Sequence, residues 1–312
     1  MNTDTNHTGI YVTLEELTVL HYRSGGFTLL PRQPKNSLLS GRHASRMRGR
    51  GLNFEELRGY LPGDDIRNID WKVTARLQKP YVRVYTEERD RPAILVVDQR
   101  LSMFFGSKVA MKSVTVAQAA AVIAWRVFDA GDRVGGVIFN DSDLIELRPH
   151  RSRKNILRFL GELVKQNRAL NVNEQINENP GQLNKALESV HRLVGHDKIV
   201  IILSDFNGLD EYTTRLITLI ARHNDVIALP IFDPLATTIP TDAKLVVSDG
   251  ELQLELDTAR GVLRKQVKEV ADKRLKAIMK WQDELAIPVL PISTEDDPAD
   301  KIRLLLGAGL PK

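Results

Sequence analysis

The stretch AILVVDQRLS, residues 93–102, opens with five apolar residues and places Asp98 directly after them. Apolar runs of this kind are typical of parallel strands that are buried on both faces of a sheet. A second run, residues 199–203, is followed in the same way by Ser204 and Asp205. Between the two runs, apolar residues recur at helical spacing over residues 112–130. These patterns predict two buried parallel strands, each ending at an acidic residue.

Strands and helices alternate over the whole of residues 92–312. The apolar patterns predict further strands at 134–139, 144–147, 226–231 and 288–292, and further helices at 152–166, 183–193, 209–222, 258–285 and 299–306. This order is typical of an α/β fold with a doubly wound, mostly parallel sheet and helices on both of its faces. A β-hairpin is predicted at 244–256, where Asp249-Gly250 separates two alternating runs. The hairpin either joins the sheet or projects from it as an insertion.

Composition limits the classes of function. The chain has 312 residues, 42% of them hydrophobic and 27% charged, and it contains no cysteine. Disulfides, thiolate nucleophiles and iron–sulfur clusters are therefore excluded. The first ten residues are polar, unlike a signal peptide, and the longest apolar run is too short to span a bilayer. We therefore expect a cytoplasmic protein without a membrane span.

Residues 1–91 differ from the alternating pattern and contain a basic segment. Residues 31–50 carry six basic residues and no acidic one: Arg32, Lys35, Arg42, Arg46, Arg48 and Arg50. Such a segment is either a solvated arm or a binding site for the phosphates of a nucleic acid. No aromatic residue is interleaved to stack on bases. The solvated arm is therefore the favoured interpretation, and a nucleic-acid partner is not expected.

The two acidic strand ends form the first candidate site. In doubly wound folds, ligands bind beyond the carboxyl ends of the strands. If the two strands are neighbours, Asp98, Ser102 and Asp205 share one crevice. Their carboxylate and hydroxyl oxygens are ligands suited to Mg²⁺. Arg100 lies between the first two in sequence and brings a permanent positive charge.

This arrangement resembles the metal-ion-dependent adhesion site of von Willebrand factor A domains, whose pattern is Asp-x-Ser-x-Ser, a later Thr and a later Asp. Asp98, Ser102 and Asp205 match the pattern, whereas Arg100 replaces its first serine and Gly181 stands where the threonine is expected. Two interpretations follow from these departures. Either Arg100 bridges the two carboxylates in place of a cation and the site is degenerate, or Arg100 points outward and a weak Mg²⁺ site remains.

Residues 54–76, FEELRGYLPGDDIRNIDWKVTAR, form a second candidate site. Acidic and basic residues alternate here and predict a network of ion pairs that locks the segment onto the main domain. Asp70 is well placed to cap a short helix that runs through residue 76, and Trp71 supplies a large anchor. The segment is either a structural clamp or a docking surface. Its candidate binding residues are Arg58, Asp64, Asp65, Arg67, Asp70, Trp71 and Arg76.

The same segment, with Arg48-Gly49-Arg50-Gly51 before it, resembles the signature of a bacterial family catalogued as domain of unknown function fifty-eight. The resemblance spans roughly residues 14–232. It implies an N-terminal extension over residues 1–91 that carries the signature, joined to a von Willebrand factor A-like domain over residues 92–312. It also implies association with a MoxR-type AAA+ ATPase and a client protein, in chaperone-like maturation or metal insertion.

Motifs of enzymes are scarce in the sequence. Neither a phosphate-binding Gly-x-x-x-x-Gly-Lys-Ser/Thr loop nor a Gly-x-Gly-x-x-Gly after a strand occurs, and the seven histidines are scattered. We therefore expect a non-catalytic protein-binding and assembly module without a cofactor. Two alternatives remain open: a Mg²⁺-dependent hydrolase that uses Asp98 and Asp205, and a nucleic-acid binder that uses residues 31–50.

Overall fold

The computed structural model describes residues 9–27, 52–87, 91–170, 178–236, 244–248, 253–257 and 261–307. The chain divides into two compact units. One comprises Met1–Arg32 and Arg91–Lys312, and the other Gln33–Asp90. We call them the α/β unit and the signature unit, because the second contains residues 54–76. The basic segment at 31–50 lies outside the described residues, so the predictions made for it remain predictions.

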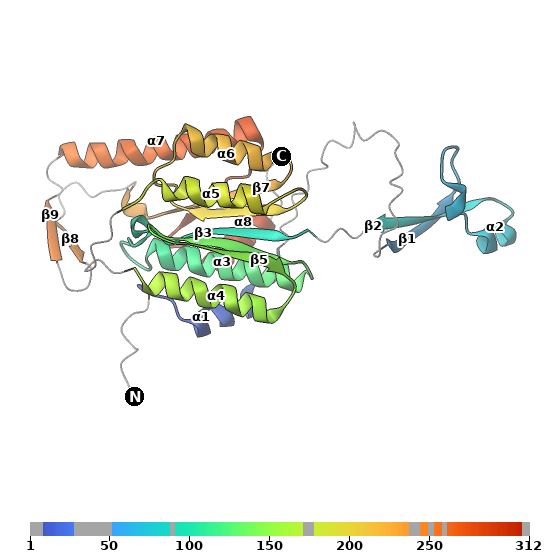
Figure 1. Ribbon diagram of the computed structural model, residues 1–312, viewed down its shortest axis with the longest axis horizontal. Helices are drawn as coiled ribbons and strands as arrows, with labels where there is room; N and C mark the ends of the chain where they lie inside the picture. The colour runs from blue at the N-terminus through green and yellow to red at the C-terminus, as the bar shows by residue number, and fades with distance from the viewer. Residues whose placement is uncertain are drawn as a thin grey trace. The chain divides into compact units, whose positions relative to one another are not determined.

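The α/β unit is built on a six-stranded sheet with the strand order β10-β7-β6-β3-β4-β5 (Figure 1). Its five parallel strands are β3 (Ala93–Asp98), β4 (Val134–Phe139), β6 (Ile199–Ser204), β7 (Asp225–Phe232) and β10 (Ile292–Ser293), and β5 (Leu144–His150) runs antiparallel to β4. Every residue of β3, β4 and β6 is buried. The predicted doubly wound, mostly parallel α/β fold is confirmed.

Helices cover both faces of this sheet (Figure 1). The first face carries α1 (Leu14–Val19), α3 (Lys112–Asp129), α4 (Arg153–Arg168) and α8 (Pro298–Gly307), and the second carries α5 (Gln182–Leu193), α6 (Glu211–Ala221) and α7 (Gly261–Leu285). Alternate residues of β3 divide between the two cores, because successive side chains of a strand point to opposite faces. Leu95 and Val97 join the first core, whereas Ile94 and Val96 join the second.

One predicted strand is shorter in the structure, and the predicted hairpin forms outside the six-stranded sheet. The strand expected at 288–292 is reduced to β10, preceded by one isolated bridge between Val289 and Ala228. Pro288 and Pro291 explain the difference, since proline has no backbone N–H to donate to a ladder. The predicted hairpin forms as β8 (Lys244–Ser248) and β9 (Gln253–Asp257), which pair with each other and not with the six-stranded sheet.

The signature unit contains a second antiparallel pair of strands. β1 (Leu52–Gly59) pairs with β2 (Tyr81–Glu87), and the connection between them holds the short 3₁₀ helix η2 (Ile66–Asn68) and the helix α2 (Trp71–Leu77). The sequence predicted α2 but not β1, whose polar residues are poor strand formers and gain strand structure by pairing with β2. Among residues 57–83, whose side chains are described, only Asp70 and Val82 are buried.

Residues 9–27 pack against the α/β unit, which is why the structure divides the chain differently from the sequence-based boundary at residue 91. The indole Nε1 of Trp125, in α3, donates to the carbonyl of Leu17 at 3.0 Å. The backbone N–H of Val12 donates to Asn167, in α4, at 2.9 Å. Beyond α1, the guanidinium of Arg23 forms an ion pair with Asp297 at 2.8 Å.

Across the described residues, we find no helix that combines the length and the apolar character needed to cross a membrane.

We predict that Leu17→Ala lowers the free energy of unfolding of the α/β unit by about 2–5 kcal/mol, because Leu17 is fully buried and its truncation leaves a cavity. Val19→Ala is the matched control on the same helix, where the side chain is exposed, and its expected effect is within about 0.5 kcal/mol. Urea denaturation followed by circular dichroism measures both. Equal effects of the two substitutions would contradict the packing of α1 against α3 and α4.

Candidate functional site

The two acidic strand ends meet at one edge of the sheet. β3 and β6 are parallel neighbours with Val97 opposite Leu203, so Asp98 at the end of β3 and Asp205 just beyond β6 lie side by side. Ser102 lies on the short 3₁₀ helix η3 (Leu101–Met103) that follows β3. Lys112, the first residue of α3, completes a group that we call the strand-end cluster: Asp98, Arg100, Ser102, Lys112 and Asp205.

The centre of the strand-end cluster is a forked ion pair. The Nε of Arg100 donates to Oδ1 of Asp98 at 3.0 Å and its Nη2 donates to Oδ2 at 2.7 Å. The remaining Nη1 donates to the carbonyls of Asn207 at 2.9 Å and Pro180 at 3.3 Å. The guanidinium also lies 5.5 Å from the ring centroid of Phe139. Two-point pairing of this kind is the strong geometry for arginine and carboxylate.

The local fold holds Asp98 in place for this pairing. Its Oδ1 accepts the backbone N–H of Arg100 at 3.0 Å, which closes a tight turn after β3. The hydroxyl of Ser204, the last residue of β6, donates to Oδ2 at 2.6 Å. Both oxygens of Asp98 therefore have two hydrogen-bond donors each, and the residue ties β3 to β6.

Asp205 receives the second positive charge of the cluster. The Nζ of Lys112 lies 2.6 Å from Oδ2, and the Oδ1 atom accepts from the backbone N–H of Asn207 at 2.9 Å and from the Ser102 hydroxyl at 3.4 Å. Burial by itself would raise the pKa of Asp205, but the charge and hydrogen bond of Lys112, helped by Arg100, lower this pKa to about 2. Asp205 is therefore ionised at neutral pH.

Arg100 is charged as well, although it is buried. Desolvation would lower its pKa, but the charge and hydrogen bonds of Asp98, together with the charge of Asp205, raise this pKa above its ordinary value. The nearest distance between the Arg100 guanidinium and Asp205 is 3.7 Å. The guanidinium thus lies between the two carboxylates, which is the first of the two arrangements that the sequence left open.

A divalent cation does not fit this set of donors. All four carboxylate oxygens of Asp98 and Asp205 already accept hydrogen bonds. The positive charges of Arg100 and Lys112 neutralise the two negative charges. An added ion would meet repulsion from Arg100 at short range. Within the described ranges, we also find no group of three histidine, aspartate or glutamate residues that is arranged to hold a metal.

The cluster is also closed to a partner. Asp98 and Arg100 are 0% and 1% exposed. The crevice predicted at Asp98, Ser102 and Asp205 is filled by the guanidinium of Arg100, so Asp98 and Arg100 are not accessible to a charged group of another protein. Ser102 and Lys112 are partly exposed and mark the outer side of the cluster.

Two further acidic strand ends escaped the sequence analysis. Asp141, two residues after β4, accepts the backbone N–H of Leu101 at 2.6 Å and that of Asn179 at 2.8 Å. Asp233, directly after β7, accepts the backbone N–H of Ser107 at 2.8 Å. The signal was available, since both aspartates follow predicted strands. Acidic residues at four adjacent strand ends thus anchor the loops of this edge.

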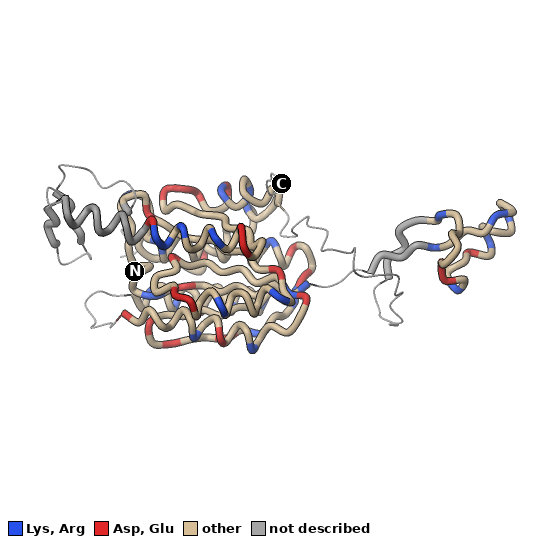
Figure 2. The backbone as a smooth tube through the Cα atoms, turned by 90° about the horizontal axis from the view of Figure 1, so that it is seen from above, with Lys and Arg blue, Asp and Glu red and all other residues tan. Residues whose placement is uncertain are grey.

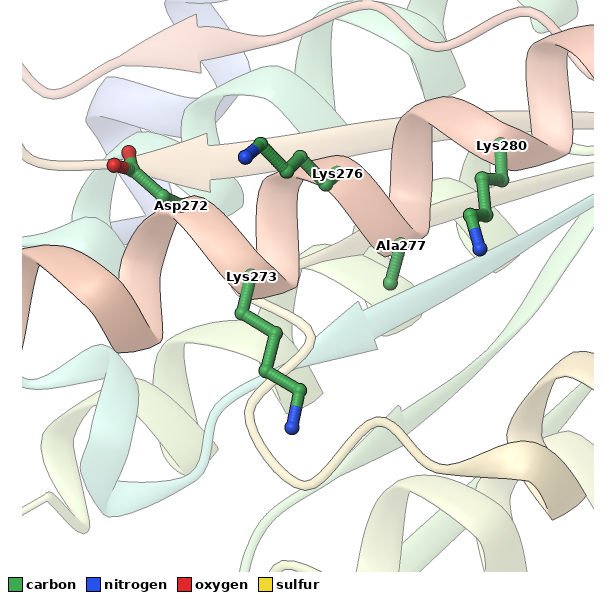
Figure 3. A pocket seen from close by; sticks show the side chains of 5 residues that line it. All are labelled: Asp272, Lys273, Lys276, Ala277 and Lys280. Carbon is green, nitrogen blue, oxygen red and sulfur yellow. The ribbon is translucent and has the colours of Figure 1, made fainter.

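A hollow of about 490 Å³ lies along α7, close to the cluster. It is lined by Asp272, Lys273, Lys276, Ala277 and Lys280 (Figure 3). The neighbouring Arg274 donates to Asn207 Oδ1 at 2.7 Å and so attaches α7 to the loop after β6. The lysines are exposed and point in different directions, which is typical of a solvated helix face.

In the signature unit, the predicted network of ion pairs is only partly present. Arg58 pairs with Asp64 at 2.8 Å, and Asp70 pairs with Arg83 at 2.8 Å. The hydrogen bond from Arg58 lowers the pKa of Asp64. Arg67 and Arg76, both expected in the network, make no ion pair in the described part of the chain and are exposed.

Two aspartates among residues 57–83 also cap helices. Asp70 accepts the backbone N–H groups of Lys72 at 3.0 Å and Val73 at 3.1 Å, which confirms its predicted role at the start of α2. These bonds, with the bond from Arg83, lower the pKa of Asp70. Asp65 accepts the N–H of Arg67 at 2.9 Å and caps η2.

Trp71 is not buried within the signature unit but 69% exposed. Three aliphatic side chains near it in sequence are exposed as well: Leu61, Ile66 and Leu77. Figure 2 maps the charged residues along the same backbone. Of the two sites predicted from the sequence, this one presents side chains to the outside, whereas the strand-end cluster encloses its own.

We predict that Arg100→Met lowers the free energy of unfolding by about 3–5 kcal/mol, because the substitution leaves the buried carboxylate of Asp98 without its partner. The double variant Asp98→Asn with Arg100→Met removes the unpaired charge and should be less destabilised than Arg100→Met alone. Lys108→Met is the control, since Lys108 is exposed and solvent screens its ion pair with Glu295. Denaturant titration measures all three. An effect of Arg100→Met no larger than that of Lys108→Met would refute the forked pair.

Comparison with known proteins gives relatives without an assigned function. Uncharacterized proteins of Mycobacterium bovis and Mycobacterium tuberculosis are 29% identical to this chain over 226 residues, which is 72% of this chain and 68% of theirs. Among solved structures, the conserved hypothetical protein BatB from Bacteroides thetaiotaomicron has a TM-score of 0.41 at 12% identity and covers 69% of this chain and 96% of its own. A von Willebrand factor type A protein from Catenulispora acidiphila has a TM-score of 0.33 at 13% identity, over 74% of this chain and 45% of its own. At these TM-scores the structural likenesses carry no argument.

The family comparison covers most of the chain. The family described as "Protein of unknown function DUF58" matches residues 56–276. This range begins inside the signature segment, later than the resemblance from about residue 14, and extends through the first half of α7 and beyond. The family expected from the signature is thereby confirmed: this chain belongs to the family of unknown function DUF58.

Proposed function

We propose that this chain is a non-catalytic protein-binding module that docks on a partner through its signature unit. The observation that carries the proposal is the set of exposed apolar side chains in that unit. Leu57, Leu61, Ile66, Trp71 and Leu77 are all exposed within 21 consecutive residues. Exposed apolar side chains gathered in this way mark interaction sites more often than free surface.

The energetics of the signature unit support the same proposal. Only Val82 is a buried apolar residue among residues 57–83. A unit of about 60 residues is marginally stable even with a good core, and a seven-residue helix has little stability of its own in water. Binding that covers Trp71 and its neighbours would supply the apolar burial that the unit lacks.

We infer that the partner is a MoxR-type AAA+ ATPase, acting in the cytoplasm on a client protein. The support for this step is the family resemblance, and not a contact within the chain. On this proposal, the ATPase hydrolyses ATP while the present chain links it to the client. The strand-end cluster then serves as a rigid scaffold, and Arg100 takes the place that a cation has in von Willebrand factor A domains.

We predict that this chain captures the MoxR-type ATPase of its own genome, and that Trp71→Ala weakens capture at least about tenfold, as expected for an aromatic anchor at the centre of an interface. Tyr22→Ala is the matched control, because Tyr22 is an exposed aromatic residue of the α/β unit. Affinity measurements with immobilised protein, in each nucleotide state, test the prediction. The absence of capture in every state, or equal capture by the two variants, would refute it.

We also predict that the protein binds no divalent cation at the strand-end cluster. The thermal midpoint should then be the same in millimolar Mg²⁺ and in EDTA, because a ligand that binds only the folded state raises the midpoint. A Mg²⁺-dependent rise that disappears in Asp98→Ala would instead support the alternative of a Mg²⁺-dependent hydrolase at Asp98 and Asp205.

A further inference from the structure

Four cations of the signature unit form no ion pair with a carboxylate in the part of the chain that the structure describes. Arg67, Lys72, Arg76 and Lys79 are exposed and make no ion pair within the described residues. We call these four residues the basic arc. They precede and follow Trp71 in the chain, on η2, on α2 and just beyond it.

The basic arc exists because the acidic groups of the same stretch are engaged elsewhere. Asp64 is held by Arg58, Asp70 by Arg83 and the start of α2, and Asp65 by the start of η2. None of these carboxylates is paired with a cation of the arc. Among residues 57–83, the three carboxylates are therefore engaged by Arg58, Arg83 and the starts of η2 and α2, and the four cations of the arc stay exposed.

The helix α2 carries two cations of the arc, Lys72 and Arg76, on the same short helix as Trp71. Val73 and Thr74 are half-buried, and the Thr74 hydroxyl accepts the N–H of Tyr81 at 3.0 Å, so this side of α2 faces β2. Trp71, Lys72 and Arg76 are exposed. Lys72 and Arg76 are four residues apart, a spacing at which like charges on a helix repel each other. A surface of opposite charge would relieve this repulsion.

We propose that the basic arc and Trp71 together bind an acidic protein surface that has an apolar recess for the indole. This inference rests on the proposed docking function and names the chemistry of the partner's side. Trp71 and its aliphatic neighbours supply apolar burial at the centre, and the four cations supply electrostatic attraction around it. The arc also sets the rate of encounter, because complementary charge steers association.

Other occupants fit the same face less well. A second copy of this chain would bring basic arc against basic arc, and like charge across an interface is unfavourable. A single-stranded nucleic acid would satisfy the cations and stack on Trp71. It would leave three aliphatic side chains, Leu61, Ile66 and Leu77, without an apolar partner. An acidic protein surface satisfies both kinds of side chain.

The fluorescence of Trp71 allows a test that needs no ATPase. The protein has three tryptophans, of which Trp125 and Trp281 are buried and Trp71 is exposed. Acrylamide should therefore quench Trp71 selectively in the full chain, and Trp71→Phe identifies its signal. Poly-L-glutamate should protect Trp71 from acrylamide at low salt, whereas poly-L-lysine should not. Protection should decrease as salt is added.

Substitutions of the cations test whether the protection of Trp71 depends on the basic arc. Lys72→Gln, Arg76→Gln and Lys79→Gln in one chain should abolish protection by poly-L-glutamate. The control removes three exposed cations of the α/β unit, with Lys185→Gln, Arg192→Gln and Arg222→Gln, and should leave protection unchanged. In the ATPase capture assay, the arc variant should lower the association rate about tenfold or more, with little effect in the control.

The outcomes separate this inference from the proposed function. Capture of the ATPase that depends on Trp71, but not on the basic arc or on salt, would refute the inference of an acidic partner surface. It would still support the docking function. Failure of capture together with protection by poly-L-glutamate would overturn only the choice of the ATPase. Stronger protection by oligo-dT than by poly-L-glutamate would reassign the face to nucleic acid. Quenching of no tryptophan by acrylamide would show that Trp71 is already covered in the free chain, and would overturn the inference.

Discussion

The forked pair between Arg100 and Asp98 is the constraint on which the carboxyl edge of the sheet depends. A buried carboxylate without a partner would cost several kcal/mol, so the turn after β3 must keep the guanidinium in place. The same guanidinium holds the carbonyls of Asn207 and Pro180, and Ser204 holds the other side of the carboxylate. Three loops that are far apart in sequence are thus fixed by one charged group, and this edge of the protein is rigid without a metal.

The strand-end cluster holds the edge of the sheet together, but it does not present its charges to a partner. The strand-end cluster is neutral overall and encloses its charges, so it offers little to a ligand. The signature unit is the opposite case: among residues 57–83, few side chains are buried, Trp71 is exposed, and four cations make no ion pair within the described residues. On the proposed function, the stable α/β unit keeps the molecule folded while the signature unit gains apolar burial on its partner.

The sequence was sufficient to predict the strands of the sheet, but not the side-chain contacts at its edge or in the signature unit. The uninterrupted apolar runs of β3 and β6 predicted their burial, and the position of Asp98 and Asp205 after them predicted their meeting. The direction of the Arg100 side chain depends on contacts with residues 80 and 107 positions away, which no local pattern encodes. In the signature unit, alternating charge suggested pairing, but hydrogen bonds to the starts of η2 and α2 competed for the same carboxylates. The strand β1 was missed because its partner, and not its own residues, makes it a strand.

The packing of residues 9–27 has a consequence for biosynthesis. Arg23 binds Asp297, and its carbonyl accepts from Arg303, 280 positions later in the chain. Until α8 has been made, residues 9–27 can therefore pack only against α3 and α4. Contacts between such distant residues slow folding and prolong the exposure of apolar surface. A nascent chain that is still short of residue 297 lacks these contacts of Arg23, and a chaperone that recognises incompletely packed helices has its best opportunity during that interval.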